Sequence, residues 1–163
     1  NQNGGFYIAP TPGSMRASAT ITDSVFSYNG VNGIWVDTVG GATTSTQVER
    51  SVMNDNGHDG LTATSGAGYA YVTLARNAIG TNGYDAIELV APPTGRVTAV
   101  MSENVLQYPG NVDASGAGIS VYASANTFYS MNCLAGPAAI YTFANNAVSG
   151  GYPTCSVTKV GGS

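Results

Sequence analysis

The segment NDNGHDG, residues 54–60, contains the residue types that acid–base or metal chemistry requires. It carries Asp55, His58 and Asp59, and Asp85 takes the place of Asp59 in the related segment GTNGYDAIEL. An imidazole beside a carboxylate can transfer a proton at neutral pH, and two carboxylates about 5 Å apart can share a calcium ion. The candidate catalytic residues are therefore Asp55, His58, Asp59 and Asp85. Of these, Asp59 and Asp85 are also the candidate calcium ligands.

A purely structural role fits the same segment better, since it falls on the most regular corner of the repeat. Asparagine, glycine and aspartate are common in tight turns, because Asn and Asp side chains bond the nearby backbone and Gly lets it turn sharply. On this interpretation the polar residues form a solvated corner of the fold, with no catalytic or metal-binding role. The sequence leaves both interpretations open.

The elements that must position these residues repeat along the chain. An Asn-Gly pair occurs in SYNGVNGIWV, NDNGHDGLTA and GTNGYDAIEL, which spaces Asn29, Asn56 and Asn82 by 26 or 27 residues. Around each pair apolar residues recur at every second position, which is the period of a strand that buries one face. A repeat of this length is typical of a solenoid. We therefore expect a single all-β domain over residues 1–163, a parallel β-helix of about six stacked coils.

Aligning the Asn-Gly pairs predicts columns of side chains that stack from coil to coil. One apolar column follows the pair and contains Phe6, Ile34, Leu61, Ile87, Ile119 and Ile140. Two others precede it and contain Ile21, Val48, Leu74 and Met101, and then Phe26, Met53, Ile79, Leu106, Phe128 and Val148. A charged column contains Asp23, Arg50, Arg76 and Glu103, which we expect to form a surface ion-pair ladder. In this alignment VDASGAG after Pro109 is an insertion of about five residues.

The repeat resembles that of a known superfamily. The pattern in ATITDSVFSYNGVNGIWV and QVERSVMNDNGHDGLTA is similar to the right-handed parallel β-helix of the pectate lyase-like proteins, over residues 5–149. Within that superfamily it most resembles uncharacterised secreted bacterial β-helix proteins, which implies a secreted or cell-surface location. The superfamily includes lyases, hydrolases, epimerases, phage tail proteins and adhesins, so the resemblance implies a fold rather than an activity.

The resemblance also draws attention to an outward column that contains Tyr7, Trp35, Thr62, Glu88 and Ser120. In enzymes of the superfamily the polysaccharide lies on this sheet face. Tyr7 and Trp35 side by side would form a flat aromatic surface suited to sugar rings. The candidate glycan-binding residues are Tyr7, Trp35 and Glu88. The alternative is that the aromatic residues only pack on each other across the strands.

A second implication concerns catalysis at the NDNGHDG corner. Alginate epimerases of the superfamily use a Tyr, a His and an Asp, and their motif includes a tyrosine that is absent from this segment. Lyases of the superfamily place Arg or Lys against the carboxylate of an acidic sugar. The sequence offers no isolated arginine for that role, since Arg50 and Arg76 belong to the charged column.

Composition restricts the partners. Only 9% of the residues are charged, and the net charge is −4, so there is no basic stripe to neutralise a nucleic acid. No apolar run approaches the roughly 18 residues that span a bilayer, so we expect no membrane partner. The chain begins at NQNGG, in what reads as the middle of a coil, and an uncapped solenoid end favours a homo-oligomer or a preceding domain.

The two cysteines, Cys133 and Cys155, are 22 residues apart, close to the shorter coil length predicted for this part of the chain. Stacked coils would bring their Cα atoms near the roughly 5.5 Å that a disulfide prefers. We predict a disulfide, which suits a secreted protein. The alternative is a pair of buried free thiols.

The sequence thus predicts a non-catalytic extracellular module, structural or adhesive, that contacts glycans through the Tyr7 and Trp35 face. The alternative is a polysaccharide lyase or C5-epimerase that acts on an acidic polysaccharide through the NDNGHDG corner. No cofactor is expected, apart from calcium at Asp59 and Asp85.

Overall fold

The structure is a computed structural model that describes residues 4–11, 14–107, 112–129 and 140–148. These residues form three parallel sheets. Sheet A contains β1 (Phe6–Ile8), β3 (Ile34–Thr38), β6 (Leu61–Ser65), β9 (Ile87–Val90) and β12 (Val112–Ser115). Sheet B contains β2 (Arg16–Thr22), β4 (Thr43–Glu49), β7 (Tyr69–Ala75), β10 (Arg96–Ser102), β13 (Ile119–Ser124) and β15 (Ile140–Ala144). Sheet C contains β5 (Val52–Asn54), β8 (Ala78–Gly80), β11 (Val105–Leu106), β14 (Thr127–Phe128) and β16 (Ala147–Val148).

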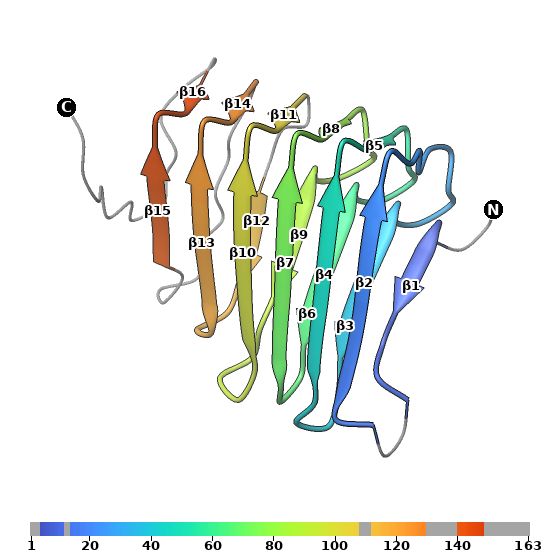
Figure 1. The fold of residues 1–163 in the computed structure, drawn as a ribbon, viewed down its shortest axis with the longest axis vertical. Helices are drawn as coiled ribbons and strands as arrows, with labels where there is room; N and C mark the ends of the chain where they lie inside the picture. The colour runs from blue at the N-terminus through green and yellow to red at the C-terminus, as the bar shows by residue number, and fades with distance from the viewer. Residues whose placement is uncertain (1–3, 12–13, 108–111, 130–139, 149–163) are drawn as a thin grey trace.

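The chain passes through sheets A, B and C in turn and then repeats, which makes a parallel β-solenoid. In Figure 1 it rises through sheet B in front, descends through sheet A behind and advances from right to left, so the coil is right-handed. The expected β-helix is therefore confirmed, with about four turns in place of six. The first turn has strands in sheets A and B, β1 and β2, but no strand in sheet C, where Val25 forms only an isolated bridge to Val52. Of the last turn, the described residues include only β15 in sheet B and β16 in sheet C. They contain no helix long and apolar enough to cross a membrane.

The core consists of stacked aliphatic ladders. Inward positions alternate with outward ones along the strands. In β7, for example, Ala70, Val72 and Leu74 are buried, and the residues between them are exposed. The ladder of Val48, Leu74 and Met101 is fully buried, and so is that of Met53, Ile79, Leu106 and Phe128. Burying one such side chain contributes about 1.5–3 kcal/mol. These two predicted columns are confirmed.

The predicted register fails at the fourth turn. Ile87 pairs with Val112 and Glu88 pairs with Asp113, so VDAS is the strand β12 and not an insertion. Ile119 lies in sheet B opposite Val97. The alignment depends on Asn-Gly pairs, and the sequence between Leu106 and Val112 has none. Val112 follows Leu106 by six residues, whereas Ile87 follows Ile79 by eight, so this connection between sheets C and A is also shorter.

The same shift corrects two other assignments. Ser120 belongs to sheet B opposite Thr98, so the outward column of sheet A continues from Glu88 to Asp113. Ile140 pairs with Ser120, and so it lies in sheet B and outside the column of Ile34 and Leu61.

Two ladders of buried asparagines hold the corners. At the corner between sheets C and A, Asn29 Nδ2 donates to Asn56 Oδ1 at 2.9 Å, and Asn56 Nδ2 donates to Asn82 Oδ1 at 2.9 Å. At the corner between sheets B and C a second ladder, which the sequence alignment did not include, links Asn77, Asn104, Asn126 and Asn146 at 2.9–3.0 Å. The buried asparagines of both ladders also donate to backbone carbonyls, which satisfies polar atoms that cannot reach water.

The left-handed backbone lies one residue before each of these asparagines. Tyr28, Asp55 and Thr81 precede the first ladder with φ between 52° and 58°. The asparagines of the ladders do not adopt this conformation themselves. The asparagine side chain fills the inside of the corner, where its amide both donates and accepts along the stack.

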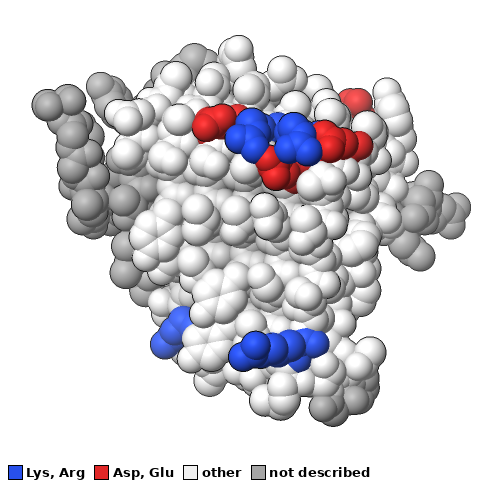
Figure 2. Space-filling model, in the orientation of Figure 1, with Lys and Arg blue, Asp and Glu red and all other residues white. Residues whose placement is uncertain are grey.

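The charged column is confirmed as an ion-pair ladder along the upper edge of sheet B (Figure 2). Arg50 donates to both carboxylate oxygens of Asp23 at 2.8 Å, and Arg76 lies 3.9 Å from Glu103. Glu49 adds a partner that the column did not include, because it accepts from both Arg50 and Arg76. Such exposed pairs stabilise a protein by about 0–1 kcal/mol each.

Candidate functional site

The corner between sheets C and A places Asp59 at the centre of a polar cluster. Its side chain is fully buried, so the interpretation as a solvated corner is wrong for this residue. Asp59 continues a ladder of its own, because its N–H donates to Asn32 Oδ1 at 3.2 Å and its Oδ1 accepts from Asp85 N–H at 3.0 Å. Its Oδ2 accepts from Thr62 Oγ1 at 2.8 Å. The carboxylate is thus held by hydrogen bonds from its own coil, through Thr62, and from the next coil, through Asp85.

His58 is fixed on two sides. Its Nδ1 lies 2.8 Å from Asp59 Oδ2, and its ring stacks on Tyr84 with centroids 4.1 Å apart. A carboxylate oxygen only accepts hydrogen bonds, so the tautomer that fits this contact carries its proton on Nδ1. In a neutral imidazole this leaves Nε2 as an acceptor, the form that a general base or a metal ligand needs.

Glu88 is the second carboxylate of the cluster. One ligand atom each from His58, Asp59 and Glu88 lies within 4.8 Å of the others. Burial, followed by the negative charge of Asp59, raises the pKa of Glu88, while the nearby His58 lowers it. Burial and the charge of Asp59 likewise raise the pKa of Asp113, the next residue in the same row. We call His58, Asp59, Glu88 and Asp113 the acidic cluster.

The structure brings together only part of the predicted site. His58 and Asp59 are in contact, Glu88 brings a second carboxylate to them, and Asp85 is joined to Asp59 through its backbone N–H. Asp55 lies at an exposed left-handed position outside the cluster. The imidazole and two carboxylates of His58, Asp59 and Glu88 form a set that suits zinc or another transition metal better than calcium, while the calcium site at Asp59 and Asp85 stays a prediction.

Tyr7 and Trp35 are neighbours at the first end of sheet A, as the register predicts. Their rings meet edge to face, with centroids 5.3 Å apart and planes at 70°, so the expected flat surface is wrong. Tyr7 is 56% exposed and Trp35 is 38% exposed. Together with Gly4 and Val31 they line a shallow hollow of about 360 Å³.

A carboxylate and a hydroxyl lie beside this aromatic corner. Tyr7 Oη donates to Asp37 Oδ2 at 3.1 Å, and Thr64 Oγ1 donates to Asp37 Oδ1 at 2.7 Å. Partial burial, followed by the charge of Asp37, raises the pKa of Tyr7. Glu88, the third predicted glycan-binding residue, lies in the same row but two strands from Trp35, and it belongs to the acidic cluster instead.

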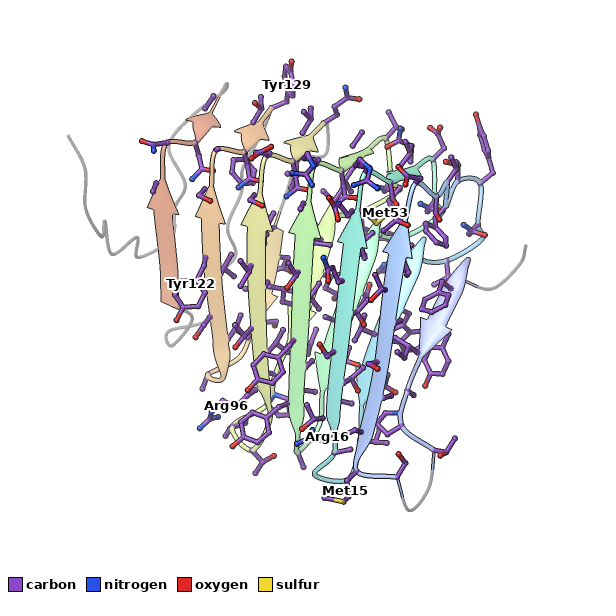
Figure 3. All side chains as sticks on the ribbon, viewed as in Figure 1. Met15, Arg16, Met53, Arg96, Tyr122 and Tyr129 are labelled. Carbon is purple, nitrogen blue, oxygen red and sulfur yellow. The ribbon has the colours of Figure 1, made fainter. Side chains whose placement is uncertain are left out.

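Sequence reasoning missed two groups of residues. Tyr84 follows the Asn-Gly pair one coil after His58, and aligning this position would have revealed the stacked pair. The other group is the exposed face of sheet B, where Figure 3 labels Arg16, Arg96 and Tyr122. Its signal is the alternation of Tyr69, Ala70 and Tyr71, the pattern of a strand with one aromatic face.

Cys133 and Cys155 lie outside the described residues, and their disulfide stays a prediction. Comparison with protein-family models, with curated proteins and with solved structures finds no match to this chain.

Proposed function

We propose that the protein is a non-catalytic module of the pectate lyase-like superfamily, secreted or surface-exposed in a bacterium, that contacts glycans. The observation that carries the proposal is the exposed aromatic corner of Tyr7 and Trp35 beside a hollow. The long repeat, the Asn-Gly corners and the parallel β-solenoid fold support the superfamily assignment.

The hollow has the two kinds of group that a sugar ring needs. Aromatic rings offer apolar surface for the C–H face of a pyranose. Beside the hollow, Asp37 and the Tyr7 oxygen, 3.1 Å apart, offer acceptors for its hydroxyl groups, since the Tyr7 proton is donated to Asp37. The hollow is open and shallow, which suits one or two rings of a longer chain better than an enclosed small molecule.

Trp35 is the single tryptophan of the chain, so its fluorescence reports directly on this hollow. We expect neutral oligosaccharides such as cellohexaose or xylohexaose to change that fluorescence on binding. Trp35→Ala should weaken the affinity measured by calorimetry at least about fivefold, as loss of an aromatic anchor does at binding sites. Tyr129→Ala removes an exposed tyrosine elsewhere and serves as the matched control.

If no oligosaccharide alters the fluorescence, and Trp35→Ala binds as the wild type does, the hollow is not a glycan site. If only acidic sugars change the Trp35 fluorescence, the ligand is recognised by its charge, and the proposal of a neutral glycan is wrong.

The second candidate is a polysaccharide lyase or C5-epimerase that uses the acidic cluster. It is favoured by one specific observation, the stacking of Tyr84 on a histidine that is oriented by Asp59. His58 Nε2 would accept the proton next to the carboxylate of a uronic acid. In a lyase the released electron pair forms a C=C bond while the glycosidic C–O bond breaks, and Tyr84 or water protonates the leaving oxygen. In an epimerase a proton returns to the opposite face of the same carbon.

This candidate ranks second because of charge. The described strands of sheet A carry no Lys or Arg, while Glu88 and Asp113 would face the substrate carboxylate. A bound divalent cation or protonation of these acids would have to remove the repulsion.

Incubation of the protein with alginate or polygalacturonate, with calcium or zinc, tests it by the ultraviolet absorbance of unsaturated product and by deuterium uptake at C5. An enzyme would lose activity in His58→Asn and keep it in Asp55→Asn, the matched control outside the cluster. Absence of both products under all conditions removes the candidate.

A further inference from the structure

The outer face of sheet B is the broadest regular surface of the described residues. Its strands β2, β4, β7 and β10 are each seven residues long and pair in register along their whole length. The outward side chains are small and polar, aromatic or cationic. They include Ser18, Thr20, Ser45, Gln47, Tyr69, Tyr71, Thr73, Val100 and Tyr122, with Arg16 and Arg96 at one edge.

Three tyrosines lie on this face, each 44–51% exposed. Tyr69 and Tyr71 project from the same strand with nearly parallel rings, 6.4 Å between centroids and 10° between planes. Tyr122 lies two strands further along, in the row of Thr73 and Val100. The face thus offers several aromatic surfaces spread across neighbouring strands.

One row of the face combines a tyrosine with two arginines. The register pairs Arg16 with Thr43, Thr43 with Tyr69, and Tyr69 with Arg96. Three strand spacings separate the two arginines, which is roughly 14 Å between their backbones. Within the described part of the chain neither arginine forms an ion pair with a carboxylate, although Arg96 Nη1 donates to the carbonyls of Pro93 and Gly95.

Charge is sharply divided over the molecule. All nine carboxylate side chains lie away from this row. Three are outward on sheet A, namely Asp37, Glu88 and Asp113. Three are at the corner between sheets C and A, namely Asp55, Asp59 and Asp85. The other three, Asp23, Glu49 and Glu103, belong to the ion-pair ladder at the opposite end of the sheet B strands. Figure 3 labels both arginines at the lower edge, and Figure 2, in the same orientation, shows two separate blue groups there with no red beside them.

We propose that the outer face of sheet B binds an acidic polysaccharide, with the chain crossing the strands along the row of Arg16, Tyr69 and Arg96. The planar guanidinium groups bind carboxylates in a forked geometry, and the tyrosine rings contact the faces of the sugars. The inference rests on the proposed function in taking the ligand to be a glycan, but it uses a different face and names the chemical class.

Two other occupants fit less well. A nucleic acid needs many phosphate contacts, and this row has two cations. A protein interface normally has a desolvated apolar core, whereas this face is mainly Ser, Thr and Tyr with a single exposed valine, Val100.

The test uses polygalacturonate oligomers as the acidic probe and cellohexaose as the neutral one, with binding to the full chain measured by calorimetry at low and high salt. Arg16→Gln/Arg96→Gln should weaken polygalacturonate binding about tenfold or more and remove most of its salt dependence. Arg16→Gln alone, which leaves the turn contacts of Arg96 intact, should show an intermediate loss. Arg50→Gln/Arg76→Gln removes the same charge from the ion-pair ladder and should change the affinity less than about twofold.

Trp35 separates this inference from the proposed function. Polygalacturonate bound on sheet B should leave Trp35 fluorescence unchanged, and Trp35→Ala should bind it normally. Equal loss in both double variants would show a general charge effect and overturn the inference, as would wild-type affinity in Arg16→Gln/Arg96→Gln. A concentration-dependent dimer in ultracentrifugation that Tyr71→Ser abolishes would assign the face to a second copy and overturn it as well.

Discussion

Tyr84 stacks on His58 across two successive coils, with ring centroids 4.1 Å apart and planes at 26°. Each residue follows the glycine of an Asn-Gly pair, and Tyr84 N–H donates to the carbonyl of His58 at 2.9 Å. The joined backbones bring the two side chains next to each other, and in the rotamers that they adopt the rings stack face to face. A tyrosine that the local motif lacks is thereby supplied by the next coil.

The buried asparagines should contribute more to stability than any surface contact. Asn104 accepts from both the backbone N–H and the side chain of Asn77, and it donates to Leu74 O and Asn126 Oδ1 at 2.9 Å. Asn104→Ala should lower the free energy of unfolding by about 2–4 kcal/mol, since buried groups lose their partners. Urea denaturation measures this. Asn54→Ala, at a residue whose Oδ1 accepts no hydrogen bond, should cost clearly less, and equal losses would contradict the argument.

Ala125 adopts a left-handed conformation with φ of 55° and has an exposed side chain. A Cβ in this region costs roughly 1–2 kcal/mol, whereas glycine pays no such penalty. We expect Ala125→Gly to leave stability unchanged or to raise it by up to about 1 kcal/mol, in contrast to the usual loss for glycine in a strand. Ala19→Gly, in β2, is the control and should destabilise the protein. Thermal unfolding of both variants decides the comparison, and a destabilised Ala125→Gly would refute it.

Gly57 lies against the neighbouring coil. A Cβ there would collide with the carbonyl group of Gly30, which is backbone and cannot rotate away. Gly57→Ala should therefore destabilise the protein by about 2 kcal/mol or more. Gly66→Ala has 3.8 Å to its nearest neighbour, Thr38 O, and should change stability little. Similar melting temperatures for the two variants would contradict the close approach.

The acidic cluster should make stability depend on pH. Burial and the charge of Asp59 raise the pKa of Glu88 and Asp113 above their ordinary values of 4.5 and 3.8, so the folded protein holds protons that the unfolded chain releases. The stabilisation is complete below these ordinary values and is lost as the pH rises through the raised pKa values. We expect urea denaturation to show a decline in stability from about pH 4 upward, ending in a plateau.

Glu88→Gln removes one of the two groups and should flatten that decline. Glu103→Gln, at an exposed position in the ion-pair ladder, is the control and should leave the decline in place. A Glu88→Gln variant with the wild-type pH profile would show that the carboxylate titrates normally in the folded protein.

Much of the fold could be predicted because the repeat is local in sequence. The alternation of apolar residues and the Asn-Gly pairs correctly predicted the parallel solenoid, its strand direction and the ladders of Val48, Leu74 and Met101. The prediction failed where its landmark was missing. Without an Asn-Gly pair before Val112, the alignment could not detect a shorter connection, so it missed β12 and assigned Ile119, Ser120 and Ile140 to the wrong sheet.

The candidate sites were less predictable than the fold. The sequence placed His58 next to Asp59, since neighbouring residues at a turn stay close whatever the packing. It did not reveal that Glu88, a residue of the next strand, would be the second carboxylate, because that depends on the orientations of side chains from two coils. The flat aromatic surface was wrong for the same reason, as Tyr7 and Trp35 share a row but their rings are rotated by 70°.

The sequence by itself determined the coil, because a period of 26 or 27 residues with alternating burial can be satisfied only by stacking equivalent side chains. Tertiary structure alone decided which residues of different coils meet. It joined Tyr84 to His58, buried Asp59, and aligned Arg16, Tyr69 and Arg96 in one row of sheet B. The physical reason is that register depends on the exact length of every turn, and side-chain contacts depend on rotamers, neither of which a column of residue types contains.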